Sequence, residues 1–459
     1  MTIWKIEDRS KSLYRSIADI IENSLAKGDF IPGDQLPTHR DLADILEVNV
    51  STVTKGYKEA EKRGLITGTT GRGTFISLDA GVDIFMQNPG STRKPLAELG
   101  LITPHFGIEP DIVKSLKKLS KTKELTEFMN YTNPSGLVEH KAAGALWAKR
   151  YGMDAKTNDV IICGGAQHAL NCILANCFEN GDRIAVSNLT YPGMKSLSKM
   201  LGISLTGIPM DKEGMVARDL EIACKRENIK GVYLMPSVQN PTTRCMSQKR
   251  REEVASIVEK YKLILIEDDA YALTLPKVPT PISQLIPEQS IFIAGISKVL
   301  GAGLRIAFTV IHNSKLRQAF SRAVLNTLWM APPLNSALIA SWIFDGTAEK
   351  VLQLKRKEAE KRYEIAQRVL SGYKTEGSGT GFYIWLELPK NYSGVSFEDN
   401  AKNMGLNVFC SERFITGDTN VPPAIRVALT CGKDNNILDK HLRTLRKVLE
   451  GEESENVVF

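Results

Sequence analysis

The sequence lacks the features that mark several classes of protein. Its seven cysteines are scattered without CxxC spacing, which argues against a disulfide framework and against a zinc site. Cys163, Cys172 and Cys177 fall in one apolar region, where buried free thiols are the expected state. No stretch is long and apolar enough to span a bilayer, and the first residues carry acids where a signal peptide needs an apolar run. We therefore expect a cytoplasmic protein without a metal or a membrane partner.

An excess of charge of one sign is also missing. The formal net charge is +7 over 459 residues, which permits an acidic partner without identifying one. Across residues 1–80 acids and bases nearly cancel, so there is no basic arm. The hydrophobic share of 42% is ordinary for a globular protein. Because the chain is too long for one compact core, we expect at least two domains.

The first expected domain covers residues 9–77 and consists of helical patterns followed by a hairpin. Apolar residues recur at helical spacing over 14–25. Thr38 is a good N-cap for a second, short helix, and Ser51 can cap a third helix that Gly64 stops. The run LITGTTGRGTFI then predicts two short strands around a glycine-rich turn. Helix, helix, turn, helix and hairpin is the order of a winged helix-turn-helix.

The third helix of this domain is expected to face DNA. A tight turn sets it across the second helix and leaves one face free to enter a major groove. Hydroxyls and an ammonium group can contact phosphates and base edges, and an arginine at the hairpin tip can reach a neighbouring groove. The alternative is a three-helix protein-binding module with a solvated basic face. The residues expected to contact DNA are Ser51, Thr52, Lys55 and Arg72, with Thr54 as a further candidate.

The runs GDQLPTHRDLADILEVNVSTVTKGYKEAEKRGLI and GRGTFI closely resemble the DNA-binding domain of GntR-type regulators. The resemblance implies that Arg40 binds a phosphate of double-stranded DNA, because it takes the place of the phosphate-binding arginine of that family. The family often has arginines near the positions of Val50 and Thr54. This departure leaves the operator sequence unreadable and gives more weight to the four contact residues named above.

Residues 78–104 break any regular pattern. Gly81, the run Asn88-Pro89-Gly90-Ser91 and Pro95 are typical of a linker. Its length would let the small domain sit at a distance from a large one, which we expect over residues 105–450.

The large domain changes to short apolar runs that alternate with helical patterns. Continuous apolar strands between helices predict a mainly parallel α/β sheet that is covered on both faces. The last part of the chain indicates a small C-terminal α+β subdomain, with strands near 382–386 and 425–429. The apolar runs of the main sheet are residues 160–162, 184–186, 232–234, 263–266, 291–293 and 306–308.

The chemically informative residues follow these runs, at the strand ends where ligands collect in such sheets. Lys298 lies in the run ISKVLGAGLRIAF. A single lysine after a strand is more often a solvated side chain, so its companions decide the interpretation. The strand KLILI leads into Asp268, and Tyr271 comes one turn further on. A lysine amine can form a Schiff base with an aldehyde, and a carboxylate can keep a pyridine nitrogen protonated.

Other strand ends supply the remaining groups that pyridoxal 5'-phosphate needs. Asn240 sits in a proline-fixed loop after GVYLM, and Tyr191 follows a strand in SNLTYPG. The strand DVIICGG passes into a helix, which leaves free N–H groups around Ala166 and Gln167 for a phosphate. Each residue alone has an ordinary structural explanation. Their joint occurrence in this order predicts a site for this cofactor.

The large domain resembles fold-type I aminotransferases, and with its GntR-type head the whole chain resembles the MocR subfamily of bacterial regulators. The resemblance implies a Schiff base between Lys298 and pyridoxal 5'-phosphate, with Asp268 paired to the pyridinium. It also implies that Tyr271 and Asn240 contact the phenolate oxygen and that Tyr191 stacks on the ring.

The same resemblance assigns the phosphate and two further contacts. Ala166, Gln167 and Arg305 are implied to hold the phosphate. Tyr131, in YTNPSG, matches a tyrosine that reaches the phosphate of the neighbouring subunit, which implies a homodimer with shared sites. Arg426, in AIRVALT, matches an arginine that binds a substrate α-carboxylate.

Three positions depart from the family pattern. Gly295 stands where many relatives have a phosphate-binding serine, and Thr243 replaces a glycine that usually follows Asn-Pro-Thr. Residues 301–303 replace a version that contains proline. These changes could weaken the affinity for phosphate, but they leave the lysine, the carboxylate and the arginine intact.

Two hypotheses for the function follow. The first is a DNA-binding transcriptional regulator whose aminotransferase-like domain senses an amino compound or pyridoxal 5'-phosphate itself, because an aminotransferase has no need of a DNA-binding head. The second is a true aminotransferase with an accessory head. A purely structural role of the cofactor site is a third reading.

Overall fold

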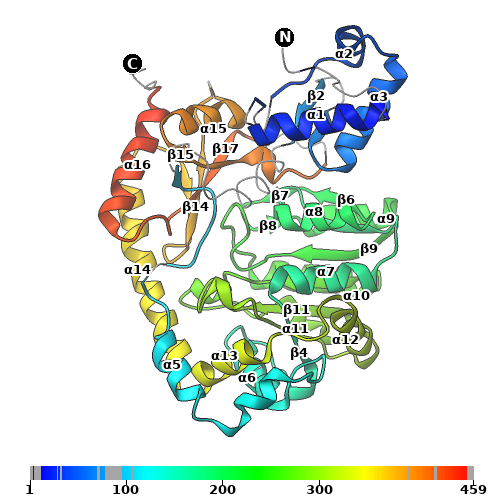
Figure 1. Ribbon diagram of the computed structural model, residues 1–459. Coiled ribbons are helices and arrows are strands. Elements are labelled where there is room, and N and C mark those ends of the chain that lie inside the picture. Colours follow the sequence, from blue (N-terminus) through cyan, green and yellow to red (C-terminus); the bar gives the residue numbers. More distant parts are fainter. Residues whose placement is uncertain are drawn as a thin grey trace. The chain divides into compact units, whose positions relative to one another are not determined.

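The computed structural model describes residues 4, 12–27, 29–30, 34–69, 73–77, 96–105, 107–390, 392–417 and 421–451. The chain divides into two compact units, Met1–Pro95 and Leu96–Phe459, shown in Figure 1. Among the described residues no helix has both the length and the apolar composition needed to cross a membrane.

The first unit is a winged helix-turn-helix, as the sequence predicts. Its core is formed by side chains of all three helices and of both strands. Helix α3 approaches α1 closely, because a Cβ on Gly56 would lie 2.8 Å from the Cβ of Ile17. The elements are α1 (Leu13–Lys27), α2 (His39–Leu46), α3 (Val50–Lys62), β1 (Ile66–Thr69) and β2 (Gly73–Ile76).

The helix caps of this unit differ from the expectation at one position. The hydroxyl of Thr38 accepts a hydrogen bond from the Asp41 N–H at 3.3 Å, which confirms the predicted cap of α2. The prediction that Ser51 caps α3 is wrong. Glu47 adopts a left-handed conformation that ends α2, and the chain re-enters a helix early enough for Asn49 to be the N-cap. Ser51 therefore lies in the first turn, exposed to solvent.

The second unit is built on a mainly parallel sheet of seven strands in the order β4-β12-β11-β10-β9-β5-β6. Only β12 runs antiparallel to its neighbours. All six predicted strands are present, but β6 was not predicted, because its half-exposed sequence SLTGI is not a continuous apolar run. The strands are β4 (Val160–Cys163), β5 (Arg183–Ser187), β6 (Ser204–Ile208), β9 (Ile229–Leu234), β10 (Ile264–Asp268), β11 (Ser290–Gly295) and β12 (Ala307–Val310).

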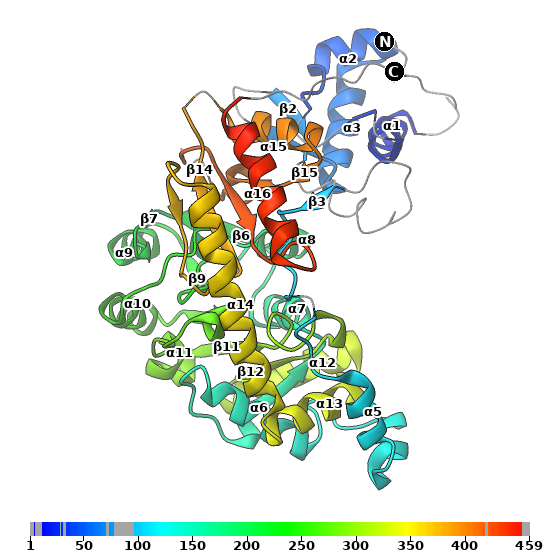
Figure 2. The same cartoon turned by 90° about the vertical axis from the view of Figure 1, so that its left-hand side faces the viewer.

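Helices bury both faces of this sheet (Figure 2). Ile184 and Val186 of β5 pack into a cluster that contains α7 (Ala166–Cys177), whereas Ala185 packs with residues of α9 and α10. Alternate side chains point to opposite faces, so every position of β5 after Arg183 can be apolar. The other helices of this unit are α5 (Ile112–Leu119), α6 (Val138–Lys149), α8 (Pro192–Met200), α9 (Ala217–Arg226), α10 (Gln248–Lys260), α11 (Ile282–Leu285), α12 (Ser314–Leu328) and α13 (Pro333–Phe344).

The predicted α+β subdomain is also present. Its antiparallel sheet has the order β13-β14-β17-β16, and a short parallel pair joins β3 to β15. Its elements are β13 (Thr375–Glu376), β14 (Tyr383–Glu387), β15 (Leu406–Asn407), β16 (Phe409–Cys410), β17 (Ala424–Ala428), α14 (Thr347–Val369), α15 (Gly394–Asn403) and α16 (Asn435–Leu449), with β3 (Ala97–Glu98) at the start of the unit and the small hairpin β7 (Met210–Asp211) and β8 (Gly214–Met215) elsewhere.

The packing of α2 gives a stability prediction. Leu42 is fully buried, while Ile45 on the same helix is 51% exposed. Leu42→Ala should lower the free energy of opening of the first unit by about 2–5 kcal/mol, because it removes buried methyl groups and leaves a cavity. Hydrogen exchange of α3 amides in the full chain measures this loss. Ile45→Ala is the matched control, and an equal effect of both variants would contradict the assigned core.

Candidate functional site

Neighbouring strand ends of the main sheet bring a lysine and a carboxylate together. Asp268 ends β10, and Lys298 follows the adjacent strand β11 after a short turn. The half-buried Lys298 donates a hydrogen bond from Nζ to the carbonyl oxygen of Ile102 at 2.7 Å. Its Nζ also lies 5.6 Å from the centroid of the Tyr271 ring. The structure therefore unites three of the residues that the sequence singled out.

The surroundings change the protonation of both groups. Burial, and after it the charge of Arg426, lowers the pKa of Lys298 to about 8, although the Asp268 carboxylate opposes the shift. Burial also raises the pKa of Asp268 to about 7, against the effect of a hydrogen bond that the Tyr233 hydroxyl donates to Oδ2 at 3.2 Å. The lysine amine is thus easier to deprotonate than a solvated one, which favours its use as a nucleophile.

A candidate anion site lies at the start of α7. Gly165 is the N-cap with φ 92°, and no side chain caps the free N–H groups of Ala166 and Gln167. A Cβ on Gly165 would lie 2.5 Å from Arg305 Nη2, so the absence of a side chain lets the guanidinium approach the helix. Free N–H groups, the positive end of the helix dipole and an arginine together suit a phosphate.

Tyr191 and Gln167 form one wall of the site. The Tyr191 hydroxyl donates to Gln167 Oε1 at 3.1 Å, and Gln167 Nε2 donates to the carbonyl of Gly193 at 3.3 Å. Burial raises the pKa of Tyr191, as does the charge of Asp268. The tyrosine is therefore neutral, and its hydroxyl lies beside the start of α7.

Arg426 and Asn240 form another wall. Both side chains are buried, and Arg426 Nη1 donates to Asn240 Oδ1 at 2.6 Å. Arg426 Nη2 donates to the Gly100 carbonyl, also at 2.6 Å. Aromatic rings of Tyr383, Phe409 and Phe414 surround the guanidinium. Burial lowers the pKa of Arg426, yet its ordinary value is so high that the group stays charged.

Tyr131 is the one candidate of the second unit that the structure places apart. Its side chain is 80% exposed, and its ring lies 5.2 Å from that of Trp329. Among the residues that the structure describes, its ring partner is Trp329, which is not one of the predicted cofactor residues. Its expected role at a neighbouring subunit stays a prediction.

Residues that the sequence reasoning missed complete the site. Tyr233, on β9, holds the Asp268 carboxylate, and its hydroxyl could have been noticed in the run GVYLM. The carbonyls of Gly100 and Ile102 contact Arg426 and Lys298, and no sequence signal pointed to them, because they are main-chain atoms. Gly165 was noticed only as part of a helix start.

The departures from the family pattern have visible consequences. Thr243 takes φ 63°, the left-handed region that favours glycine, so a threonine carries the strain where relatives place a glycine. A Cβ on Gly295 would meet no atom within 4 Å. Space for a serine side chain therefore remains at that position.

The residues fit pyridoxal 5'-phosphate. Asp268 Oδ1 is buried and has no hydrogen-bond partner among the described residues, as expected of an acceptor that awaits a pyridinium N–H. A buried unpaired carboxylate oxygen is costly. The uncapped helix start beside Arg305 suits the phosphate, and Lys298 suits the aldehyde.

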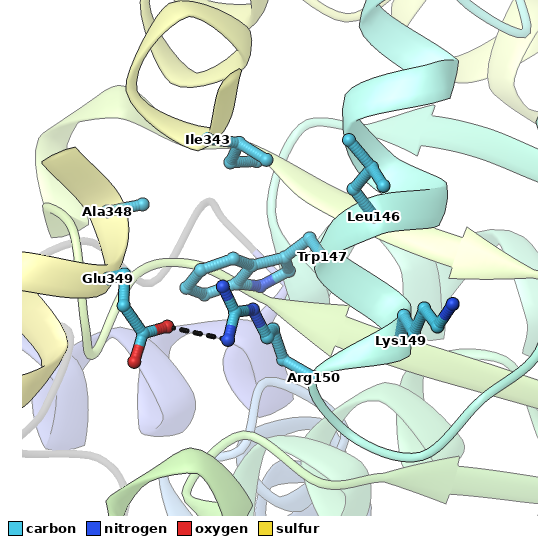
Figure 3. Close-up of a pocket in the computed structure, with 7 residues that line it drawn as sticks. All are labelled: Leu146, Trp147, Lys149, Arg150, Ile343, Ala348 and Glu349. Carbon is cyan, nitrogen blue, oxygen red and sulfur yellow. Dashed lines mark ion pairs between the residues drawn. The ribbon is translucent and has the colours of Figure 1, made fainter. Parts of the chain in front are cut away.

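Two cavities of this unit differ in their relation to the site. One, of about 390 Å³, lies between α6 and α13–α14, where Arg150 and Glu349 form an ion pair of 2.9 Å (Figure 3). It contains none of the predicted residues. Another, of about 530 Å³, includes Thr103 and the loop 301–303, which joins Lys298 to Arg305 in sequence. The lining of the first is Leu146, Trp147, Lys149, Arg150, Ile343, Ala348 and Glu349.

In the first unit, the predicted DNA contacts lie mostly on the surface. Arg40 on α2 and Ser51 and Lys55 on α3 are exposed, and Thr52 is half-buried. The Thr54 hydroxyl donates to the Val50 carbonyl at 3.0 Å, so part of its hydrogen-bonding capacity is used. Arg72 lies outside the described residues. All of these assignments stay predictions.

Comparisons with known proteins agree with both units. Residues 104–445 match the family model of aminotransferase class I and II, and residues 13–76 match that of the gntR family of bacterial regulatory proteins. The chain is 35% identical over 453 residues to the HTH-type transcriptional regulator YdeF of Bacillus subtilis, covering 97% of each chain. It is 26% identical to the vitamin B6 salvage pathway transcriptional repressor PtsJ of Salmonella typhimurium, over 83% of this chain and 86% of that protein.

Solved structures show the same fold in the large unit. An archaeal alanine:glyoxylate aminotransferase superposes with a TM-score of 0.74 at 23% identity, covering 86% of this chain and 99% of that one. The α-aminoadipate aminotransferase LysN of Thermus thermophilus superposes with a TM-score of 0.71 at 22% identity, covering 86% and 98%. At this identity the likeness concerns the fold.

The electrostatic effect of Asp268 on Lys298 can be tested by titration. Asp268→Asn should move the pKa of Lys298 below about 8, because the carboxylate stabilises the ammonium form. Arg305→Gln should move it in the opposite direction, since that guanidinium lowers the value. The pH dependence of Lys298 acylation in the cofactor-free protein, followed by mass spectrometry, measures both. Identical midpoints in the two variants and the unmodified chain would contradict the assigned interactions.

Proposed function

We propose that this chain holds pyridoxal 5'-phosphate on Lys298. The chain is a MocR-type transcriptional regulator: it belongs to the aminotransferase class I and II family and carries a gntR-family head. We further propose that this site senses an amino compound or the cofactor itself and thereby controls binding of the head to DNA. The observation that carries the proposal is the convergence of a desolvated lysine with a buried carboxylate whose second oxygen has no hydrogen-bond partner among the described residues.

The site residues have distinct parts in this proposal. When bound, pyridoxal 5'-phosphate supplies an aldehyde that reacts with amines and a ring that withdraws electrons. Lys298 provides the amine that attaches to it, and Asp268 accepts the ring N–H. Asn240 has its Oδ1 engaged by Arg426, so its Nδ2 is left to donate to the phenolate oxygen together with Tyr271.

The remaining contacts orient the cofactor. The ring of Tyr191 would stack on the pyridine ring. The hydrogen bond that its hydroxyl donates to Gln167 holds the tyrosine in place. The N–H groups of Ala166 and Gln167 and the guanidinium of Arg305 hold the phosphate. Gly295 lacks the hydroxyl that would add one more donor there.

A homodimer is part of the proposal. Tyr131 and Trp329 form an exposed aromatic pair, at 80% and 54% exposure, and Leu328 beside them is 42% exposed. The same Leu328 lies next to Gly164, because a Cβ there would meet Leu328 Cδ2 at 2.8 Å. Leu328, which precedes Trp329 in the sequence, therefore lies beside the glycine pair that leads into the proposed phosphate site. A second copy that covers this surface would place its own Tyr131 near that phosphate.

The head is proposed to bind double-stranded DNA through the exposed side of α3. Ser51, Thr52 and Lys55 would contact the major groove, with Arg40 on a phosphate and Arg72 at the wing. Arg63 has a different role, because it forms ion pairs with Asp19, Glu22 and Glu59 inside the unit. Paired heads of a dimer would read two half-sites.

The effector is proposed to carry an amine and a carboxylate, or to be the cofactor. Arg426 is the buried cation that a carboxylate would meet, and the name of the similar repressor PtsJ links that protein to vitamin B6 salvage, which supports the cofactor as effector here. A ligand changes DNA binding only if it binds one arrangement of the protein better than another.

An aminotransferase with an accessory head is the second candidate, favoured by the full set of reactive side chains. Sustained conversion of amino acids to keto acids, without sequence-preferring DNA binding, would establish it instead. The deciding experiment is a salt titration of binding to the DNA upstream of the gene for this chain, with and without pyridoxal 5'-phosphate.

Lys298→Ala should abolish the visible absorbance that pyridoxal 5'-phosphate acquires when it is attached to the protein, because no other amine is assigned to this site. Circular dichroism should remain unchanged. Lys315→Ala, at an exposed lysine of α12, is the control and should keep the absorbance. Full absorbance in the Lys298 variant would refute the attachment.

Lys55→Ala should weaken DNA binding nearly uniformly across sequences, because we assign its ammonium to a phosphate at the rim of the major groove. The slope of log affinity against log salt should become shallower by about 1. The visible absorbance of the bound cofactor should not change. Lys212→Ala, at an exposed lysine of the second unit, should leave both unaltered, and unchanged salt dependence in Lys55→Ala would remove α3 from the interface.

A further inference from the structure

The first turn of α7 has no side chain at its N-cap. A serine, threonine or aspartate at such a position accepts a hydrogen bond from the N–H of the second or third helical residue. Gly165 cannot accept one, so the N–H groups at the start of the helix stay available to a ligand. Another group must then fix the main chain of this turn, where Gly165 has φ 92°.

His168 supplies this contact. It is the third residue of α7, and its Nδ1 accepts a hydrogen bond from the Gly164 N–H at 3.0 Å. In a capping box the side chain of the third residue likewise returns to the main chain in front of the helix. Here it returns to the residue before the N-cap. His168 thus uses an N–H that lies outside the helix and leaves those of Ala166 and Gln167 for the phosphate.

The second ring nitrogen of His168 joins α7 to α12. Nε2 lies 2.7 Å from Thr327 Oγ1, and the Thr327 hydroxyl donates to the Ala323 carbonyl at 2.7 Å. Because Nδ1 accepts from Gly164, a neutral imidazole carries its hydrogen on Nε2 and donates it to Thr327. Cys172 Sγ lies beside both groups, 3.3 Å from Nε2 and 3.5 Å from Thr327 Oγ1. Both nitrogens of the imidazole therefore have defined partners.

The ring of His168 fits this arrangement only in its neutral form. An imidazolium would carry a hydrogen on Nδ1 and point it at the hydrogen of the Gly164 N–H, so the contact would become repulsive. Burial lowers the pKa of His168, which keeps the ring neutral at physiological pH. The positive charge for a phosphate comes from Arg305, which approaches Gly165. His168 therefore acts through the direction of a hydrogen bond and not through charge.

Packing and a further hydrogen bond confine the same two glycines. A Cβ on Gly164 would lie 2.8 Å from Leu328 Cδ2 and 3.5 Å from His168 Nδ1, so the end of α12 and the imidazole both lie against its main chain. The Gly165 N–H donates to the Cys163 carbonyl at 2.8 Å, which ties the turn to β4. The imidazole is the one side-chain acceptor in this set of contacts.

On the basis of the proposed function, we propose that His168 is a positioning residue for the cofactor phosphate. By holding the Gly164 N–H it fixes the turn that leads into the N–H groups of Ala166 and Gln167, so the anion meets donors that are already arranged. A site that is ordered before binding loses less conformational entropy when the ligand arrives, and it therefore binds more tightly. His168 itself is assigned no contact with the phosphate. Its effect is accordingly confined to ligands that carry one.

Two amide substitutions separate the roles of the two ring nitrogens. In His168→Asn the side-chain oxygen can replace Nδ1 as acceptor, whereas in His168→Gln the side-chain nitrogen can replace Nε2 as donor. His168→Ala offers neither group. Hydrogen exchange of the Gly164 amide in the full, cofactor-free chain should therefore be faster in His168→Gln and His168→Ala than in His168→Asn. Equal exchange in all three variants would contradict the assigned contact.

Titrations of the same cofactor-free chain with pyridoxal 5'-phosphate and with pyridoxal, which lacks the phosphate, test the consequence for binding. His168→Ala and His168→Gln should weaken binding of pyridoxal 5'-phosphate by up to about tenfold, the size expected for one hydrogen bond, and should leave that of pyridoxal unchanged. His168→Asn should bind both like the unmodified chain. His312→Ala is the matched control, at a histidine of the same unit whose Nε2 lies 2.9 Å from the Asp154 carbonyl oxygen, and should change neither affinity.

Three outcomes would overturn the role of His168. Equal weakening of both ligands in His168→Ala would indicate a general loss of structure, and binding by His168→Asn as weak as that of His168→Ala would exclude Nδ1 as the effective acceptor. The third concerns the unmodified chain and does not depend on how well the other variants fold. Nitrogen NMR of its histidine rings, with the His168 signal assigned as the one missing from His168→Asn, should show a hydrogen on Nε2 alone near neutral pH. A hydrogen on Nδ1 would contradict the contact with Gly164.

The two levels of proposal fail in different ways. An unmodified chain that gains no visible absorbance with pyridoxal 5'-phosphate would overturn the proposed function. A normal absorbance and a preference for the phosphorylated ligand in the unmodified chain, together with equal affinities in all three His168 variants, would overturn only the role of His168.

Discussion

The whole site depends on one geometric constraint, namely that parallel strands end at the same edge of their sheet. Asp268 ends β10, and Lys298 follows the neighbouring strand β11 after a short turn. Both residues therefore lie at this edge of the sheet. Burial then acts on both groups at once. Burial disfavours the charged ammonium of Lys298 and the charged carboxylate of Asp268 alike. Each group is therefore suited to bind a molecule that supplies the complementary charge or hydrogen-bonding atom.

This constraint also explains how much the sequence could predict. Six strands of the main sheet were found because both of its faces are buried and their sequences are therefore continuous apolar runs. The edge strand β6 was missed because one side of SLTGI is half exposed. The start of α3 was misjudged at Ser51, since the left-handed Glu47 that ends α2 cannot be read from local propensity.

For the site, side chains were predictable and main-chain atoms were not. Lys298, Asp268, Asn240 and Arg426 stand in recognisable runs at strand ends, and the structure gathers them. The carbonyls of Gly100 and Ile102 carry no sequence signature, because every residue has a carbonyl. Their importance comes from a long-range approach, between residue 100 and residue 426, which only the folded chain reveals.

The close approach of Arg305 to Gly165 has a consequence for how this protein can evolve. Any side chain at position 165 would occupy the volume of the guanidinium and would also have to adopt a backbone angle that favours glycine. A methyl group there becomes sterically admissible only if the arginine is shortened or withdrawn. Homologues in which one of the two residues is replaced are therefore expected to have the other replaced as well. Gly165 and Arg305 should covary.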